Sequence, residues 1–280
     1  MSTPLLEFRN VCYTYPGGKH PAIQNLNLTI TGGQKTAILG HNGCGKSTLL
    51  FLADGLYRCT SGVIYWQGSP LQYTPASLNL WRQHIGLTFQ DPERQLVAAT
   101  VAEDISYGLC NLQLPPTEIK QRLQQTLKDF NLTELANFPL HHLSLGQKRR
   151  IAIAGVMALQ PKLLLLDEPT AYLDNRQTHN LFQELDRIHA SGTTVVMATH
   201  DIDLAYAWAD QIIVLHEGQM VLSDQTNTVF ANVALLEQLQ LGIPTLLEVW
   251  YALPEHQRAQ RVPPRTIAEL RSHLLSHCKN

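Results

Sequence analysis

The stretch "KTAILGHNGCGKSTLL" at residues 35–50 decides the fold class of this chain. The short apolar run "KTAILG" reads as a strand, and the segment that begins at "KSTLL" reads as a helix. Between them, "GHNGCGKS" at residues 40–47 fits the pattern G-x-x-x-x-G-K-[ST], in the strand–loop–helix context that this pattern requires. The sequence therefore predicts a phosphate-binding loop inside an α/β fold.

The physical role of each position in this loop follows from its residue type. Glycines let backbone N–H groups point inward at phosphate oxygens, and the helix that follows adds its positive end. Lys46 neutralises phosphate charge, and the Ser47 hydroxyl can bind Mg²⁺. The predicted nucleotide-binding residues of the loop are Gly40, His41, Asn42, Gly43, Cys44, Gly45, Lys46, Ser47 and Thr48.

Polar residues at the ends of three further predicted strands complete this site. "LLLLDEP" at residues 163–169 is an apolar strand that ends in Asp167, which can hold Mg²⁺ through water, and Glu168, which can orient or deprotonate an attacking water. His200 in "ATHD" and Gln90 in "LTFQDP" follow strands of the same sheet. Because ligands bind at the carboxyl edge of such sheets, we expect these side chains near the phosphates, with Gln90 as a further metal ligand.

The remaining patterns outline the domain organisation. Apolar strands at 161–169 and 193–201 flank a helix at 175–191, which is a βαβ unit and predicts a parallel sheet. We further expect strands at 5–15, 23–30 and 61–68, a helix at 116–136, a hairpin at 211–224 turning at Glu217-Gly218, and helices at 233–241, 245–253 and 266–277.

The composition excludes several classes of protein. The chain has 280 residues, 44% of them hydrophobic, and a net charge of −2, so it lacks the basic balance of a nucleic-acid binder. It has neither a secretory signal pattern at its N-terminus nor an apolar run of the ~18 residues that a membrane span needs. Five scattered cysteines without a C-x-x-C pair predict reduced thiols in a cytoplasm.

A second stretch, "LSLGQKRR" at residues 143–150, raises a question of its own. Ser144 is a good N-cap for the apolar helix that follows, but Lys148, Arg149 and Arg150 crowd its first turn, where the helix dipole disfavours positive charge. An anion docked at this helix end would account for the charges. The sequence thus predicts a second anion site in addition to the phosphate loop.

Together these motifs resemble the ATP-binding subunit of ABC transporters. "GHNGCGKS" resembles Walker A, "LLLLD" resembles Walker B with Glu168 as catalytic carboxylate, Gln90 resembles the Q-loop glutamine and His200 the switch histidine. "LSLGQ" is similar to the LSGGQ signature (Ser144, Leu145, Gly146, Gln147), "AYLD" to the D-loop with Asp174, and Tyr15 to an aromatic that stacks on adenine. Two positions depart from the family: Leu145 replaces a glycine, and Tyr172 occupies a position that is often small.

The resemblance implies a fold and an answer to the question of two anion sites. It implies a P-loop NTPase core with an antiparallel β subdomain and a helical subdomain: an ATP-binding domain at 1–222, with the helical part at about 91–160, and a C-terminal helical extension at 223–280. In this family two ATPase domains pair head to tail, so the signature of one copy acts in trans on ATP held by the other.

Finer features resemble the ATPases of cobalt/nickel energy-coupling-factor (ECF) importers. That resemblance implies ATP and Mg²⁺ as cofactors, a homodimer, and a transmembrane coupling subunit and a substrate-binding subunit as partners at the cytoplasmic membrane face. It also places residues 91–108 beside the groove that receives the coupling subunit, where Glu93, Arg94, Gln95, Glu103 and Asp104 would pair with arginines.

Other functions remain open at this point. They are an ECF ATPase for a vitamin, a soluble ABC ATPase that acts on DNA or ribosomes, a non-hydrolytic regulatory cassette, and a serine hydrolase suggested by "HLSLG". Against the hydrolase, the segment before Ser144 is interrupted by proline and is not strand-like. The sequence does not name the transported substrate; we expect cobalt first, nickel second and a vitamin third.

Overall fold

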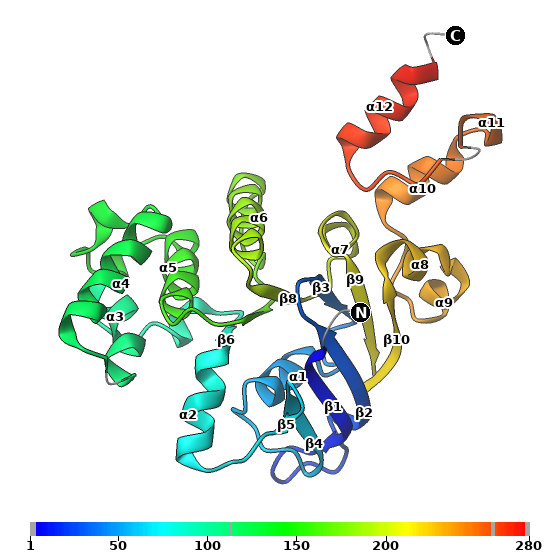
Figure 1. Cartoon of the computed structure of the whole chain (residues 1–280). Helices are drawn as coiled ribbons and strands as arrows, with labels where there is room; N and C mark the ends of the chain where they lie inside the picture. Colours follow the sequence, from blue (N-terminus) through cyan, green and yellow to red (C-terminus); the bar gives the residue numbers. More distant parts are fainter. Residues whose placement is uncertain (1–3, 113, 259–260, 278–280) are drawn as a thin grey trace.

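The computed structural model describes residues 4–112, 114–258 and 261–277, and the chain forms two β-sheets with helices packed around them (Figure 1). The first sheet is antiparallel, in the order β2-β1-β4-β5. Its strands are β1 (Pro4–Tyr13), β2 (Ile23–Thr31), β4 (Ser61–Trp66) and β5 (Ser69–Pro70). This sheet is the antiparallel β subdomain that the family resemblance implies.

The second sheet has six strands in the order β10-β9-β3-β8-β7-β6. They are β3 (Lys35–Leu39), β6 (Ile85–Thr88), β7 (Leu163–Asp167), β8 (Thr194–Thr199), β9 (Gln211–His216) and β10 (Gln219–Gln225). All pair in parallel except β9 and β10, which form the predicted hairpin. Every residue of β7 and β8 is buried, as expected of strands covered on both faces.

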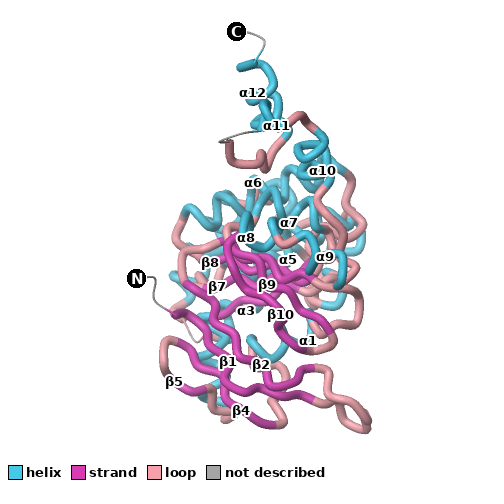
Figure 2. The backbone as a smooth tube through the Cα atoms, turned by 90° about the vertical axis from the view of Figure 1, so that its right-hand side faces the viewer, coloured by secondary structure: helices cyan, strands magenta, loops and turns pink. Residues whose placement is uncertain are grey.

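Two hydrophobic cores lie on opposite faces of this sheet. Helix α1 (Lys46–Ala53) packs between the two sheets, which Figure 2 shows one below the other, and its leucines share a core with both. The other face is covered by helices within residues 101–158 and 181–209 and by the first helices of the C-terminal part of the chain. Because both faces are covered, the strand ends at the sheet's edge are left to form a site.

The α-helices between β5 and β9, with the exception of the one at 116–129, begin at a residue whose side chain caps the first turn. They are α2 (Pro75–His84), α3 (Val101–Asn111), α4 (Pro116–Asp129), α5 (Leu145–Met157), α6 (Asn175–Ala190) and α7 (Ile202–Trp208), with 3₁₀ turns η1 (Pro92–Arg94), η2 (Thr133–Leu135) and η3 (Leu140–His142). Capping boxes start α3, α5 and α6. The helix expected at 116–136 ends at Asp129 because Asn131 takes a positive φ of 52°.

After β10 the chain forms five short helices. These are α8 (Thr226–Ala231), α9 (Val233–Gln238), α10 (Thr245–Ala252), α11 (Glu255–Arg258) and α12 (Ile267–His277). The sequence predicted α9, α10 and α12 but missed α8 and α11. Phe230 of α8, Leu236 of α9 and Leu247 of α10 are buried in the main core, whereas α11 and α12 stand out from the body (Figure 1).

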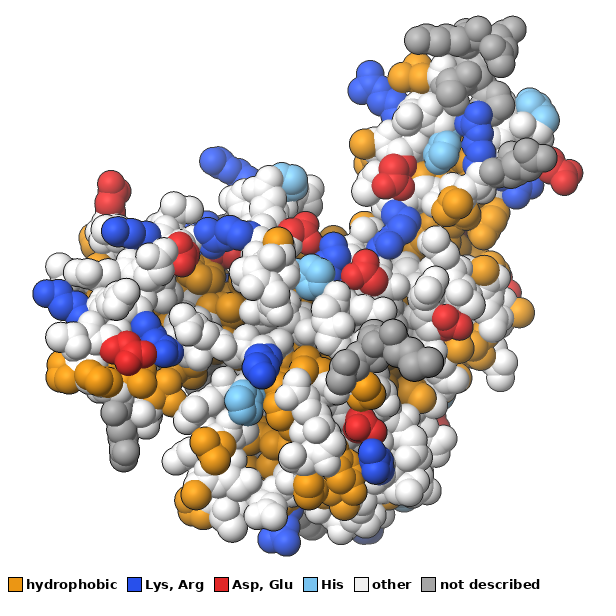
Figure 3. Space-filling view, in the orientation of Figure 1, with side chains coloured by type: hydrophobic (Ala, Val, Ile, Leu, Met, Phe, Trp, Pro, Cys, Tyr) orange, Lys and Arg blue, Asp and Glu red, His pale blue; other side chains and the backbone are white. Residues whose placement is uncertain are grey.

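The surface bears charges of both signs. On the face that Figure 3 shows, acidic and basic side chains are interspersed, and neither kind forms a large patch. No helix within the described part of the chain is long and apolar enough to cross a bilayer.

Candidate nucleotide site

Residues from five separate segments meet in one pocket of about 460 Å³ at the carboxyl edge of the six-stranded sheet. It is lined by Tyr15, Ala22, Asn42, Gly43, Gly45, Lys46, Ser47, Thr48, Gln90, Glu168 and His200. Ten of these eleven are residues that the sequence predicted for nucleotide binding or catalysis. Gly40, His41 and Cys44 belong to the same loop but do not line the pocket.

The phosphate loop owes its shape to its glycines. A Cβ on Gly40 would lie 2.3 Å from the Leu215 carbonyl oxygen, so only glycine fits against the end of β9. Gly45 has a φ of 108°, which side chains disfavour, and places the start of α1 directly after the loop. Lys46 is buried, and its ammonium donates to the carbonyl oxygens of Gly40 (2.7 Å) and His41 (3.2 Å).

Glu168 is held in an uncommon backbone conformation at the end of β7. Its φ is 43°, its N–H donates to the Ala198 carbonyl, and its side chain is buried. One carboxylate oxygen lies 2.9 Å from His200 Nδ1 and 3.5 Å from Lys46 Nζ. Positive φ at a non-glycine residue concentrates at functional sites, and here it brings the carboxylate, the imidazole and the ammonium together.

Asp167 precedes this glutamate and has a different environment. Burial raises the pKa of its carboxyl, and the Ser47 hydroxyl beside it acts in the opposite direction. Its Oδ1 atom is buried and has no hydrogen-bond partner. Because Mg²⁺ prefers oxygen ligands and often retains waters, this unpartnered oxygen, Ser47 and Gln90 form a donor set that fits the ion.

Tyr15 lies at the mouth of the pocket within an aromatic cluster. Its hydroxyl hydrogen-bonds the Thr48 hydroxyl at 2.8 Å, and its ring meets those of Tyr13 and Tyr57 edge to face at 5.1 and 5.8 Å. The residue is 42% exposed, which leaves room for a planar group to stack on its ring. The cluster continues from Tyr57 to Phe51, beside the phosphate loop.

The signature residues lie away from this pocket. Ser144, Gly146 and Gln147 line a separate cavity of about 110 Å³ between α5 and α6. Ser144 and Gln147 form the capping box of α5, and Asp174 forms the corresponding box of α6 with Gln177. The structure thus places these three signature residues in a different cavity from the phosphate loop of the same chain.

Leu145 and Tyr172, the two departures from the family pattern, line a third space. This groove, of about 770 Å³, is bordered by α1, the Gln90 loop and Asp167. Tyr172 is 83% exposed and has a φ of 63°.

Two of the three basic residues near the start of α5 have partners within the chain, so their charges do not by themselves require the external anion that the sequence suggested. Lys148 pairs with Glu93. Arg149 is buried and donates to the carbonyl oxygens of Pro169 and, at 2.8 Å, Gln90. The dipole penalty is therefore offset inside the chain, and Arg149 fixes the Gln90 loop to the segment after Glu168. No signal in the sequence identified this role.

The charged stretch 91–108 is likewise committed to internal contacts. Gln95 bonds the backbone of Phe89, Glu103 serves the capping box of α3, and Asp104 accepts from Val97 and Ala98 N–H groups. The Glu93 carboxylate forms an ion pair with Lys148. Arg94 Nε lies 3.6 Å from Asp91 Oδ2. Most of these side chains therefore stabilise local structure, and pairing of this stretch with a partner's arginines stays a prediction.

Comparison with known proteins agrees with this geometry. The ABC transporter family model matches residues 23–171. The chain is 56% identical over 274 residues to a putative ABC transporter ATP-binding protein of Thermosynechococcus vestitus, covering 98% of this chain and 96% of that protein. It is 40% identical over 245 residues to the energy-coupling factor transporter ATP-binding protein EcfA of Carboxydothermus hydrogenoformans, covering 88% and 89%.

A solved structure extends the comparison to the fold. CbiO1 from Clostridium perfringens, described as part of the ABC transporter complex CbiONQ, matches with a TM-score of 0.75 and 37% identity over 88% of this chain and 97% of that one. The chain therefore belongs to the ATP-binding subunits of ABC transporters and is an ATPase. Within that family it is an ATPase of the ECF type, similar to EcfA and CbiO1.

Proposed function

We propose that this chain hydrolyses ATP to energise the import of a transition-metal ion, cobalt first and nickel second, through an ECF-type transporter. The observation that carries the hydrolytic part is the single pocket in which Lys46, Ser47, Gln90, Glu168 and His200 meet. The metal substrate rests on the sequence features that resemble cobalt/nickel importers. An ECF ATPase for a vitamin is the alternative.

Each residue of the pocket has a role that its position supports. Glu168 orients and deprotonates the attacking water, and His200, 2.9 Å from it, contacts the γ-phosphate. Lys46 neutralises charge on the β- and γ-phosphates. Mg²⁺, held by Ser47, Gln90 and Asp167 through water, would supply Lewis-acid stabilisation of the developing phosphate charge. Tyr15 stacks on adenine.

The complete site forms between two copies of the chain. Ser144, Gly146 and Gln147 line a different cavity from the phosphate loop, so they are available to a nucleotide bound by a second copy. Asp174, at the start of α6, lies along the same interface. A head-to-tail homodimer then contains two sites, each built from one phosphate loop and one signature.

Mixing two inactive variants tests this arrangement. Lys46→Ala removes the ammonium group that neutralises charge on the phosphates. Gly146→Asp places a negative charge at the start of α5, which suits the helix dipole but repels a partner's phosphate. Each variant alone should hydrolyse ATP poorly, while Gly146→Asp should still bind it. In a mixed dimer one site carries both defects and the other none, so mixing should restore up to about a quarter of native activity.

Failure of the mixture to recover any activity would contradict the trans site, provided that mixed dimers form. Loss of ATP binding by Gly146→Asp would contradict it as well. Gly146→Ala is the matched control: its added Cβ lies 3.2 Å from the flexible Gln177 amide, so most activity should remain.

The groove beside the Gln90 loop is our proposed contact with the transmembrane coupling subunit, at the cytoplasmic face of the membrane. Its walls include Phe51, Leu56, Tyr57 and Phe89, which offer an apolar surface to a partner helix. Cells that express this chain with the membrane subunits encoded beside it should accumulate radioactive cobalt, and Lys46→Ala should abolish the accumulation. Uptake of a vitamin instead of a metal ion would favour the alternative substrate.

A further inference from the structure

The helix that follows the proposed switch histidine is held at both ends by the C-terminal extension. Helix α7 begins two residues after His200. At its start, the Asp203 carboxylate accepts from the Thr245 N–H (2.7 Å) and the Thr245 hydroxyl (3.0 Å), both at the first residue of α10. One acidic side chain thus joins the switch helix to the extension by two hydrogen bonds.

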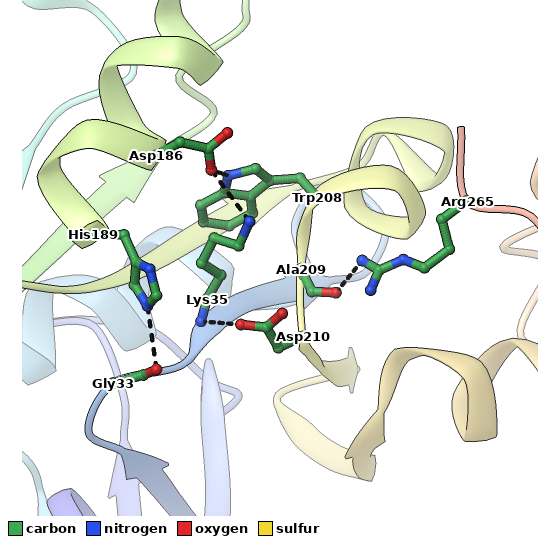
Figure 4. A network of polar contacts seen from close by, with 8 residues as sticks. All are labelled: Gly33, Lys35, Asp186, His189, Trp208, Ala209, Asp210 and Arg265. Carbon is green, nitrogen blue, oxygen red and sulfur yellow. Dashed lines mark hydrogen bonds and ion pairs between the residues drawn. The ribbon is translucent and has the colours of Figure 1, made fainter. Parts of the chain in front are cut away.

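The other end of α7 is held by a second segment of the extension. Figure 4 shows the Arg265 guanidinium reaching Ala209 at the end of α7. Arg265 Nε also donates to the Tyr206 carbonyl at 2.8 Å, and the Tyr206 hydroxyl donates to the Pro264 carbonyl at 3.1 Å. A cation at a helix C-terminus satisfies carbonyl groups that have no partner within the helix.

The contacts at the C-terminal end of α7 lie in a buried and well-packed setting, whereas the Asp203–Thr245 contact at its start is exposed. Tyr206 is only 2% exposed, and its ring meets Phe230 of α8 edge to face at 5.1 Å. On the opposite side, Trp208 donates to Asp186 of α6, which also pairs with Lys35 at the start of β3 (Figure 4). Helix α7 therefore lies between the extension and the sheet, with its ends fixed by hydrogen bonds.

The extension also touches the phosphate loop. His41 Nε2 donates to the carbonyl oxygen of Leu239, the C-cap of α9, at 2.9 Å. The same loop residue offers its own carbonyl to Lys46. The extension thus contacts both segments that flank Glu168, the phosphate loop on one side and the switch segment on the other.

From these contacts we propose that the C-terminal extension acts in cis to position His200 for hydrolysis, with Asp203 and Arg265 as positioning residues that act through α7. The proposal rests on the role of His200 in the proposed function. Neither positioning residue lines the nucleotide pocket, so their removal should alter the alignment of His200 and leave ATP binding intact.

The test compares Asp203→Ala, His200→Ala and the double variant in the full-length chain. Asp203→Ala should lower kcat for ATP hydrolysis on the order of tenfold, with KM for ATP within about twofold of native. Asp203→Asn should retain most activity, because an amide can still accept from the Thr245 N–H and donate to its hydroxyl. Glu248→Ala, which removes an acidic side chain from the first turn of α10, is the matched control and should leave kcat unchanged.

The double variant separates positioning from mere stabilisation. If Asp203 acts through His200, adding Asp203→Ala to His200→Ala should lower kcat no further. An equal fold-loss in both backgrounds would overturn the proposal, as would native kcat in Asp203→Ala. If Asp203→Ala fails to fold, Arg265→Gln at the other end of α7 takes its place in the same comparison.

The result also distinguishes this proposal from the proposed function. If His200→Ala hydrolyses ATP at the native rate, the role of His200 is wrong and positioning by the extension falls with it. If His200→Ala is impaired but the two losses multiply, only the role of the extension is overturned.

Discussion

At the scale of single residues, the carboxylate of Glu168 governs the chemistry that we expect of the pocket. Glu168→Gln preserves the shape of the side chain but removes its charge and its ability to take a proton. We expect hydrolysis to fall by on the order of 100-fold, with ATP binding retained. Phosphate release and equilibrium dialysis with labelled ATP measure the two quantities.

Glu134→Gln is the matched control, because Glu134 is exposed in η2, and it should behave as native. Native turnover in Glu168→Gln would show that another group activates the water.

The sequence predicted the residues at strand ends better than the residues between elements. Lys46, Glu168 and His200 follow apolar strands, and parallel topology brings their positions to one edge. The burial of the Arg149 side chain could not be predicted, because its hydrogen-bond acceptors are backbone carbonyls 20 and 59 residues away in the sequence. A carbonyl acceptor carries no residue-type signal in a sequence.

At the scale of elements, Arg149 links α5 to the loops that follow β6 and β7. Arg149→Met keeps an apolar stem of similar length but leaves the Pro169 and Gln90 carbonyls without this donor. An unmet buried polar group costs about 1–3 kcal/mol, so the Tm should fall by several degrees. Hydrolysis should fall as well, because the Gln90 loop loses an anchor.

Calorimetry and phosphate release measure these effects. Arg122→Met is the control: it breaks a partly exposed pair with Glu118 on α4 and should cost no more than about 1 kcal/mol. A Tm that falls no further in Arg149→Met than in Arg122→Met would argue against the anchoring role.

The contact between α5 and α6 predicts a dependence of stability on pH. Burial raises the pKa of Glu184 from 4.5 to about 7, against the opposing effect of Arg150 and Arg187. Between these values the folded protein holds a proton that the unfolded chain has released, so this group's contribution to stability is lost as pH rises through the window. Glu184→Gln should therefore reduce the fall in Tm between pH 5 and pH 8.

Thermal unfolding at the two pH values checks this expectation. Glu255→Gln, on α11, is a control that should leave the native difference unchanged. A difference that is the same in Glu184→Gln and the native protein would assign the pH dependence to other groups.

At the scale of the whole molecule, the proposed composite site predicts association that depends on ATP. Glu168→Gln should shift from its chain mass of 31.4 kDa to twice that mass when ATP is added, because unhydrolysed nucleotide bridges the two copies. Light scattering during size-exclusion chromatography measures the mass. Adding Lys46→Ala should keep the protein monomeric, and a dimer that forms equally well without nucleotide would contradict the bridge.

The overall fold was more predictable than the arrangement of the extension. Apolar runs and glycine-rich turns predicted most strands, the parallel sheet and the hairpin, because strand periodicity is a local signal, whereas the separate antiparallel sheet was implied by the family resemblance. The contacts of the extension with α7 join polar groups of residues 42 to 59 positions apart in the sequence. Such pairs leave no periodic pattern in the sequence. Nothing in the sequence therefore indicated that Asp203 binds Thr245.

The position of Cys44 affects how readily this protein reacts with oxidants. This thiol is buried inside the phosphate loop, against Gly40, and burial raises its pKa. Oxidants attack the thiolate, so the loop keeps its cysteine in the less reactive form for as long as it stays closed. Of the four cysteines that the structure describes, Cys110 is the exposed one. We therefore expect Cys110 on α3 to be oxidised before Cys44 in the phosphate loop.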